Sequence, residues 1–247
     1  MLSIHLLPFG VGIIISFSLL LNGCSMVSPL QKPEIGPAGA PTQAKSNPPI
    51  LQRFQSPPAE LYNIEATAGV MFEGIVKKDW SKAETSLTTL SKLWGQVQPQ
   101  IGEKKGVKET NEALQSLSGA IMEKKTGDAY ESLTKFMSGI SDIGKSYKLS
   151  PVSDIIGIGI GIRNVSFYAM DQDWSKTKTK MKELEGSWGQ AKPNMESVGI
   201  LGKVTITHTI IKQLKDAVDA ENKGSVEEHI ANVNESMGYI RDYYRGK

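Results

Sequence analysis

Apolar residues recur at steps of three and four from residue 56 to the end of the chain. This period places them on one face of a helix, whereas a strand would alternate apolar and polar positions. The first such stripe consists of Leu61, Ile64, Ala68, Met71 and Ile75, and seven more stripes follow it. The pattern therefore predicts eight amphipathic helices and an all-α fold.

The eight stripes form two sets of four, because the second half of the chain repeats the first. Identical residues separated by 94 positions mark the repeat: Ser56 and Ser150, Trp80 and Trp174, Trp94 and Trp188, Pro99 and Pro193. Further along, the offset becomes 97, as between Leu117 and Leu214. The repeat predicts two four-helix units, residues 56–149 and 150–247, with three residues gained in the second connection near 193–204.

Each unit can bury its stripes in either of two ways. Four helices with short connections can pack as an antiparallel bundle. Alternatively, neighbouring hairpins can stack as a short helical solenoid, in which the two units share a core. The sequence is compatible with both arrangements.

Several residues mark where these helices begin. We predict that the Ser-Pro pairs at 56 and 150 supply the N-cap and first residue of the first helix in each unit. Asp79 and Asp173 can accept the free N–H groups of the next helix. Ser225 and Glu228 have the spacing of a capping box for the last helix.

Two tryptophans frame the second helix of each unit. The two members of a pair are fourteen residues apart, so both rings lie on nearly the same helix face. Large apolar rings on such a face are typical of bundle cores, and we predict four core residues: Trp80, Trp94, Trp174 and Trp188. The alternative is that these rings stack on a ligand.

This pattern resembles a small helical domain of unknown function. It consists of Asp-Trp, a small residue, spaced leucines and a second tryptophan. That domain occurs in membrane-anchored proteins of Gram-positive bacteria. The resemblance covers residues 79–145 and, more weakly, 173–241, where Thr177 stands in place of the alanine found at Ala83. It implies a helical fold and a location in the cell envelope, and it implies no activity.

The first 23 residues have the pattern of a bacterial lipoprotein signal peptide. Residues 4–21 carry no formally charged side chain and end in a lipobox made of Leu21, Asn22, Gly23 and Cys24. Asn22 is unusual in a lipobox, and the first five residues hold no Lys or Arg. We predict that lipid is attached to Cys24 and anchors the protein on the extracytoplasmic face of the cell membrane. The alternative is an uncleaved membrane helix, because this apolar segment is just long enough to span a bilayer.

Residues 24–55 are predicted to form a disordered tether. Eight of the chain's twelve prolines lie between residues 25 and 58, and this stretch shows no apolar period. Such a segment cannot bury enough apolar surface to offset the entropy lost on folding. The tether would separate the helical part from the membrane.

The composition argues against several functions. Lys and Arg number 28 against 26 Asp and Glu, so the chain lacks the strong positive charge typical of proteins that bind nucleic acid. Cys24 is the only cysteine, and its assignment to lipid leaves no thiol for a disulfide, a metal site or catalysis. We therefore predict no nucleic-acid partner.

Two glycine-rich segments match parts of nucleotide-binding motifs. Residues 139–146, GISDIGKS, fit the phosphate-binding P-loop pattern, but the residues before them follow a helical stripe and not a buried strand. Residues 157–162, GIGIGI, lack the third glycine of a dinucleotide fingerprint. We predict that the first match is accidental. For the second we predict close helix packing at Gly157 and Gly161, with a flexible or strand-like functional segment as the alternative.

No set of side chains has the spacing of a metal or catalytic centre. His208 and His229 lie outside any Glu-x-x-His or HExxH pattern, so we predict surface or helix-capping histidines and no metal or other cofactor. The Gly-x-Ser-x-Gly pattern of serine hydrolases is absent. Four alternate lysines between 176 and 182 are predicted to be a solvated face, or else a contact for anionic lipid or wall polymer.

These features predict a non-catalytic lipoprotein of the cell envelope, whose duplicated helices act as an interaction or scaffold module for a protein partner. The alternative is an extracytoplasmic small-molecule-binding or sensory domain, with its ligand near the glycine-rich segment. A hydrolase of cell wall or lipid is the least favoured function, because no residues meet the requirements of an active site.

Overall fold

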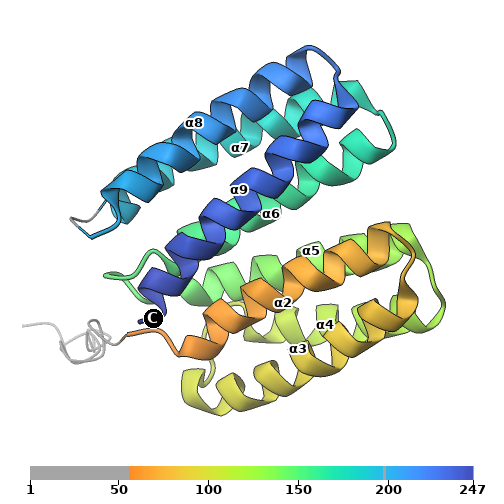
Figure 1. Cartoon of the computed structure of the whole chain (residues 1–247). Helices are drawn as coiled ribbons and strands as arrows, with labels where there is room; N and C mark the ends of the chain where they lie inside the picture. The colour runs from red at the N-terminus through yellow and green to blue at the C-terminus, as the bar shows by residue number, and fades with distance from the viewer. Residues whose placement is uncertain (1–55, 197–198, 247) are drawn as a thin grey trace, which may run out of the picture. The chain divides into compact units, whose positions relative to one another are not determined.

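The structure, a computed structural model, describes residues 56–196 and 199–246. The predicted signal peptide, the lipobox with Cys24 and the tether lie outside these residues. The described part of the chain folds into eight α-helices with no β-strand, which confirms the all-α class (Figure 1). The helices are α2 (Ala59–Val76), α3 (Trp80–Ile101), α4 (Val107–Met122), α5 (Thr126–Gly144), α6 (Val152–Met170), α7 (Trp174–Met195), α8 (Leu201–Asp219) and α9 (Lys223–Tyr244).

The first four helices form one bundle and the last four form another. Helix α2 packs against α3, α3 against α4, and α4 against α5, and α5 closes the ring by packing against α2. Helices α6 to α9 close a second ring in the same order. Each repeat is therefore a four-helix bundle, and we call the two rings the first and second bundle.

The two bundles also pack against each other. Helix α6 contacts both α2 and α5, and α9 contacts α2, as the facing helices in Figure 1 show. A single cluster of buried apolar side chains includes residues of both bundles. The structure therefore combines bundle packing within each repeat with the shared core expected of the solenoid alternative.

The three residues that distinguish the repeats lengthen a helix and not a connection. Helices α3 and α7 both have 22 residues, whereas α4 has 16 and α8 has 19. The connections that precede α4 and α8 are equal in length, since each helix starts six residues after the preceding one ends. The extra residues, 201–203, lie within the predicted range 193–204, but they extend the start of α8 and do not lengthen the connection.

Two of the predicted helix starts are confirmed. The Asp79 carboxylate accepts the Lys82 N–H at 3.0 Å, and that of Asp173 accepts the Lys176 N–H at 3.1 Å. Each bond satisfies one of the free N–H groups of a first turn. Because Asp173 accepts hydrogen bonds from Lys176, the pKa of its carboxyl lies below the ordinary value.

The predicted start at Ser150 is confirmed in part: Pro151 directly precedes α6, but the Ser150 Oγ atom accepts the Val152 N–H at 3.3 Å. The predicted starts at Ser56 and Ser225 are wrong. Pro58, and not Ser56, stands at the N-cap position of α2. In α9 the cap is Asn222, whose side-chain oxygen accepts the Ser225 N–H at 3.1 Å. This bond places Ser225 inside the first turn of the helix, where it cannot act as the cap.

The tryptophans of each pair differ in burial. Trp94 and Trp188 lie in the core with 3% and 2% of their surface exposed, whereas Trp80 and Trp174 are half-buried and pack against the core. The latter two are the first residues of α3 and α7, so they sit at a bundle end and not in its middle. The prediction of a core position therefore fits Trp94 and Trp188 better than Trp80 and Trp174.

The ring N–H groups of the buried tryptophans have equivalent partners in the two bundles. Trp94 Nε1 donates to Asn111 Oδ1 at 2.7 Å, and Trp188 Nε1 donates to His208 Nδ1 at 3.1 Å. Asn111 and His208 are separated by 97 positions, and the tryptophans by 94. A buried indole N–H needs an acceptor, and each repeat supplies one from the same place in its third helix.

Candidate functional site

The P-loop match lies in a helix. Residues Gly139 to Gly144 belong to α5, and no strand precedes them in the described part of the chain. A side chain at Gly139 would meet Thr110 Oγ1 at 2.2 Å, so this glycine allows α4 and α5 to approach closely. The segment has none of the strand, loop and helix geometry that a P-loop requires.

The glycine-rich segment at 157–162 is helical throughout and belongs to α6. A Cβ atom at Gly161 would lie 2.9 Å from Leu184 Cδ1 of α7, as predicted for a packing glycine. The prediction is wrong for Gly157, where a Cβ would meet nothing within 4 Å. The second close approach is instead at Gly159, where a Cβ would lie 1.9 Å from Glu65 Oε1 of α2.

Alanine substitutions should separate these glycines. Gly157→Ala should raise the free energy of unfolding by about 1 kcal/mol, because alanine favours a helix and the added methyl group meets no neighbour. Gly159→Ala should lower it, because the methyl group displaces the Glu65 carboxylate. Urea unfolding measures both changes. Equal effects of the two substitutions would contradict the placement of Glu65 against α6.

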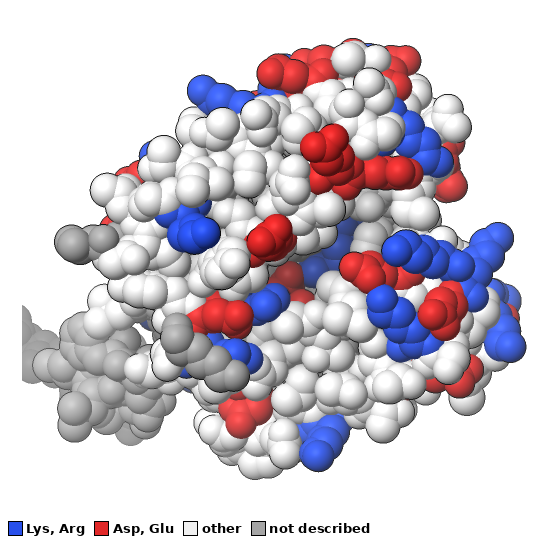
Figure 2. Space-filling model, viewed as in Figure 1, with Lys and Arg blue, Asp and Glu red and all other residues white. Residues whose placement is uncertain are grey.

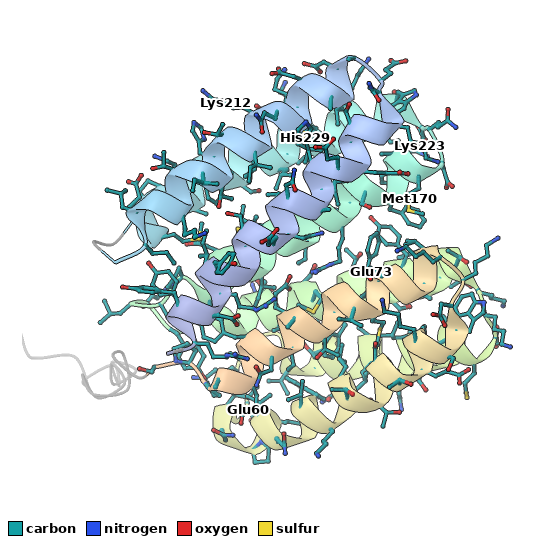
Figure 3. The ribbon with its side chains drawn as sticks, viewed as in Figure 1. Glu60, Glu73, Met170, Lys212, Lys223 and His229 are labelled. Carbon is teal, nitrogen blue, oxygen red and sulfur yellow. The ribbon has the colours of Figure 1, made fainter. Side chains whose placement is uncertain are left out.

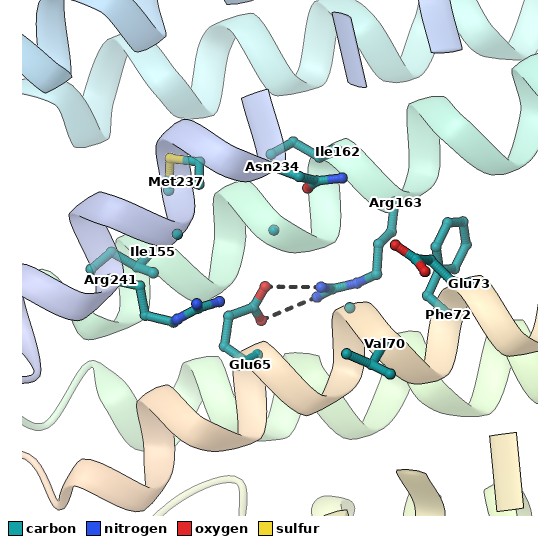
Figure 4. A pocket seen from close by; sticks show the side chains of 14 residues that line it. Glu65, Val70, Phe72, Glu73, Ile155, Ile162, Arg163, Asn234, Met237 and Arg241 are labelled. Carbon is teal, nitrogen blue, oxygen red and sulfur yellow. Dashed lines mark hydrogen bonds and ion pairs between the residues drawn. The ribbon is translucent and has the colours of Figure 1, made fainter. Parts of the chain in front are cut away.

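Glu65 and Arg163 form a buried ion pair that connects the two bundles. Arg163 Nη1 donates to Glu65 Oε1 at 2.8 Å, and Nη2 donates to Oε2 at 3.2 Å (Figure 4). Both side chains are about nine-tenths buried. Burial raises the pKa of the Glu65 carboxyl above its ordinary value, and the charge and hydrogen bonds of Arg163 offset part of this rise.

A cavity of about 310 Å³ adjoins the ion pair. It is lined by α2, α6 and α9, and charged side chains gather in the hollow between the bundles in Figure 2. Its apolar lining includes Val70, Ile155 and Met237. A volume of this size lies at the lower end of the range for ligand pockets, roughly 300–1,000 Å³.

Arg241 of α9 is the second arginine at this cavity. Figure 4 shows its side chain pointing toward Glu65. Its Nε atom is buried and has no hydrogen-bond partner among the described residues. The contact of Nε with Asp242 Oδ1 spans 3.6 Å, which is too long for a hydrogen bond. The cavity therefore contains a donor that protein atoms do not satisfy.

Aromatic side chains and hydrogen bonds also join the bundles. Tyr130 of α5 stacks on Phe167 of α6 with ring centroids 3.8 Å apart, and its hydroxyl donates to Asn164 Oδ1 at 2.6 Å. Burial raises the pKa of Tyr130 to about 12, so the phenol keeps its proton at neutral pH. These contacts hold α5 beside α6.

A surface groove separates α8 from α9 in the second bundle. Its lining includes Ile206, Ile210 and Tyr239, and it encloses about 200 Å³. Ile206 and Tyr239 are 50% and 51% exposed. Lys203 Nζ lies 4.1 Å from the centre of the Tyr239 ring, close enough for a cation–π contact.

The equivalent groove of the first bundle, between α4 and α5, has different chemistry. With the offset of 97, Glu109 corresponds to Ile206 and Asp142 corresponds to Tyr239. Both acidic residues line the α4/α5 groove, together with Glu112 and Lys135. The two repeats therefore share a groove in which Ile206 and Tyr239 of the second bundle stand where the first bundle has Glu109 and Asp142.

The remaining predicted side chains are the lysines of α7 and the two histidines of the second bundle. Lysines 176, 178 and 180 pair with Asp173, Glu221 and Glu183 at 2.6–3.0 Å, which favours the solvated-face interpretation. His208 accepts from Trp188, and the Nδ1 atom of His229, labelled in Figure 3, is buried without a hydrogen-bond partner. Within residues 56–196 and 199–246, no group of three His, Cys, Asp or Glu side chains could hold a metal ion.

Sequence reasoning missed the ion pair, because its members are 98 residues apart in separate repeats. A signal was present in each helix. Glu65 lies within the apolar stripe of α2, between Ile64 and Ala68, and Arg163 is the only basic residue of α6. A charged residue on the buried face of an apolar helix needs a partner of opposite charge, although the pattern does not say which.

Comparisons with protein-family models, with curated proteins and with solved structures found no match to this chain. The likeness to a helical domain of unknown function therefore stays a prediction. None of the helices in the described ranges is both long enough and apolar enough to cross a membrane.

Proposed function

We propose that this protein is a non-catalytic interaction module of the bacterial cell envelope, which binds a protein partner in the groove between α8 and α9. The lipobox pattern at Cys24 and the proline-rich segment after it support membrane anchoring and a tether. The helical bundles would then be held near the membrane and free to meet an envelope protein.

The observation that carries this proposal is the difference between the two equivalent grooves. Ile206 and Tyr239 expose about half of their surface, whereas the first bundle has Glu109 and Asp142 at these positions. The fold itself does not require apolar residues there, because the first bundle forms without them. Leu201 and Tyr243 extend the exposed apolar surface along the same two helices.

The geometry favours a partner that presents an apolar helix face. Ile206 and Ile210 are four residues apart on α8, so they form one ridge of the groove, and Tyr239 on α9 lines the groove with them. An amphipathic helix can place its apolar side chains in such a groove. Lys203 and Glu235 both line the groove, so a partner helix with an acidic and a basic residue beside those apolar side chains would fit it.

Replacing the groove residues by those of the first bundle tests the proposal. The Ile206→Glu, Tyr239→Asp double variant should reduce by about tenfold or more the amount of partner that co-purifies with the full chain from solubilised native membranes, because interface hot spots are often worth 2 kcal/mol or more. The matched control is Glu109→Gln, Asp142→Asn in the first bundle, which should leave the partner bound.

Thermal unfolding of both variants distinguishes lost binding from lost folding. The exposed positions predict midpoints close to that of the wild type. Partner recovery that is unchanged in the groove variant, with an unchanged midpoint, would contradict the proposal.

A further inference from the structure

The cavity between the bundles contains two arginines but only one of them is paired with a buried carboxylate. Arg163 uses both terminal nitrogens on Glu65. Glu73, which also lines the cavity, is paired with Lys82 at 2.7 Å. Arg241 is attracted to Glu65 as well, and its Nε atom lies 3.6 Å from the partly exposed Asp242. The two arginines therefore share one buried carboxylate at the cavity.

The unpaired donor makes this charge available to a ligand. The buried Nε–H of Arg241 has no acceptor, and leaving such a group unsatisfied costs free energy. The exposed side chain of Asn234 lines the same cavity and can also donate hydrogen bonds. An anion in the cavity would accept hydrogen bonds from the terminal nitrogens of Arg241 and from the Asn234 amide, and arginine forms its strongest hydrogen bonds with carboxylate and phosphate oxygens.

The other walls limit the size and charge of the anion. Val70, Ile155 and Met237 offer apolar surface, so the ligand needs an apolar part beside its charged group. The Glu65 carboxylate lies close to the same space and repels additional negative charge. A single negative charge balances Arg241, whereas the two charges of a phosphate monoester would exceed it.

We infer that the cavity between α2, α6 and α9 binds a small monocarboxylate with an apolar body, whose carboxylate pairs with Arg241. This site is separate from the α8/α9 groove, and it is formed only where both bundles contribute side chains. Its occupant would contact α2 of the first bundle and α9 of the second, so binding would stabilise the packing of one bundle on the other.

Hexanoate is a suitable probe, because it combines one carboxylate with a short apolar chain. We expect its addition to the full-length protein to shift the NMR resonance of the Arg241 Nε–H group and to raise the unfolding temperature. Hexanol, hexylamine and hexyl phosphate provide matched chains with no charge, positive charge and greater negative charge. These three compounds should bind more weakly than hexanoate.

Two variants locate the binding. Arg241→Gln should weaken hexanoate binding by about tenfold or more, because a hydrogen bond to a charged group is worth about 1.5–3 kcal/mol. Arg245→Gln is the matched control, since Arg245 directly follows α9, four residues after Arg241, and lines a different cavity. Hexanoate binding that is absent, or that is equally strong in Arg241→Gln, would overturn the inference. Tighter binding of hexyl phosphate or hexylamine would overturn the choice of a monocarboxylate.

Discussion

Trp188→Ala is expected to lower the free energy of unfolding by about 3–5 kcal/mol, since the substitution removes a fully buried aromatic ring. Trp188 is 2% exposed and its ring N–H is bonded to His208, so the change leaves both a cavity and an acceptor without its donor. Guanidinium unfolding, followed by circular dichroism, measures the effect. Because a domain is typically only 5–15 kcal/mol stable, this loss would be a large part of the total.

Trp174→Ala is the matched control for this substitution. Trp174 lies on the same helix, fourteen residues earlier, and is only half-buried. Its replacement should cost clearly less free energy, and the same difference should separate Trp80 from Trp94 in the first bundle. A Trp174→Ala variant as unstable as Trp188→Ala would mean that the two rings contribute equally to the core.

Arg163→Met should be the second strongly destabilising substitution, with a loss of about 3–5 kcal/mol at pH 7. It removes the partner of a buried carboxylate, which then remains charged in an apolar environment or takes up a proton. The double variant Glu65→Met, Arg163→Met removes both charges and should be close to the wild type or more stable. Thermal and chemical unfolding of the single and double variants form a double-mutant cycle.

The stability of the Arg163→Met variant should depend on pH in a characteristic direction. Burial raises the pKa of Glu65, and loss of the arginine raises it further. A carboxyl whose pKa is higher in the folded than in the unfolded protein binds protons more tightly when folded. Stability is therefore greatest below the ordinary glutamate pKa, and falls as pH rises through the raised value.

Glu73→Gln provides the comparison with an exposed pair. Glu73 bonds to Lys82 at 2.7 Å, but both side chains are well exposed, so the loss should not exceed about 1 kcal/mol. Equal losses for Glu73→Gln and Arg163→Met would contradict the special importance of burial in the Glu65–Arg163 pair.

The sequence predicted the parts of the fold that depend on local pattern. The apolar stripes predicted eight helices, and the side chains of Asp79 and Asp173 were recognised as caps because a cap acts within three residues. The start of α9 was misplaced, because Asn222 and Ser225 are both good capping residues and only the structure shows which one is used. The length of α8 was missed for a similar reason, since three extra residues fit a helix as well as a connection.

The candidate sites depend on contacts that local pattern does not contain. Glu65 and Arg163 belong to different repeats, and the offset of the repeat does not pair them. The internal repeat does help with the surface groove, because it shows that Ile206 corresponds to Glu109. The sequence alone shows that Ile206 replaces an acidic residue. This replacement indicates a binding surface only once the structure shows that Ile206 is exposed and that Tyr239 lines the same groove.

Site-specific photo-cross-linking in the native membrane tests the proposed function most directly. A photoreactive phenylalanine analogue placed at position 206 should cross-link to one partner protein. The same analogue placed at position 109, in the equivalent groove of the first bundle, should not. Cross-links from both positions to the same proteins, or from neither, would contradict the proposal that the α8/α9 groove is the binding surface.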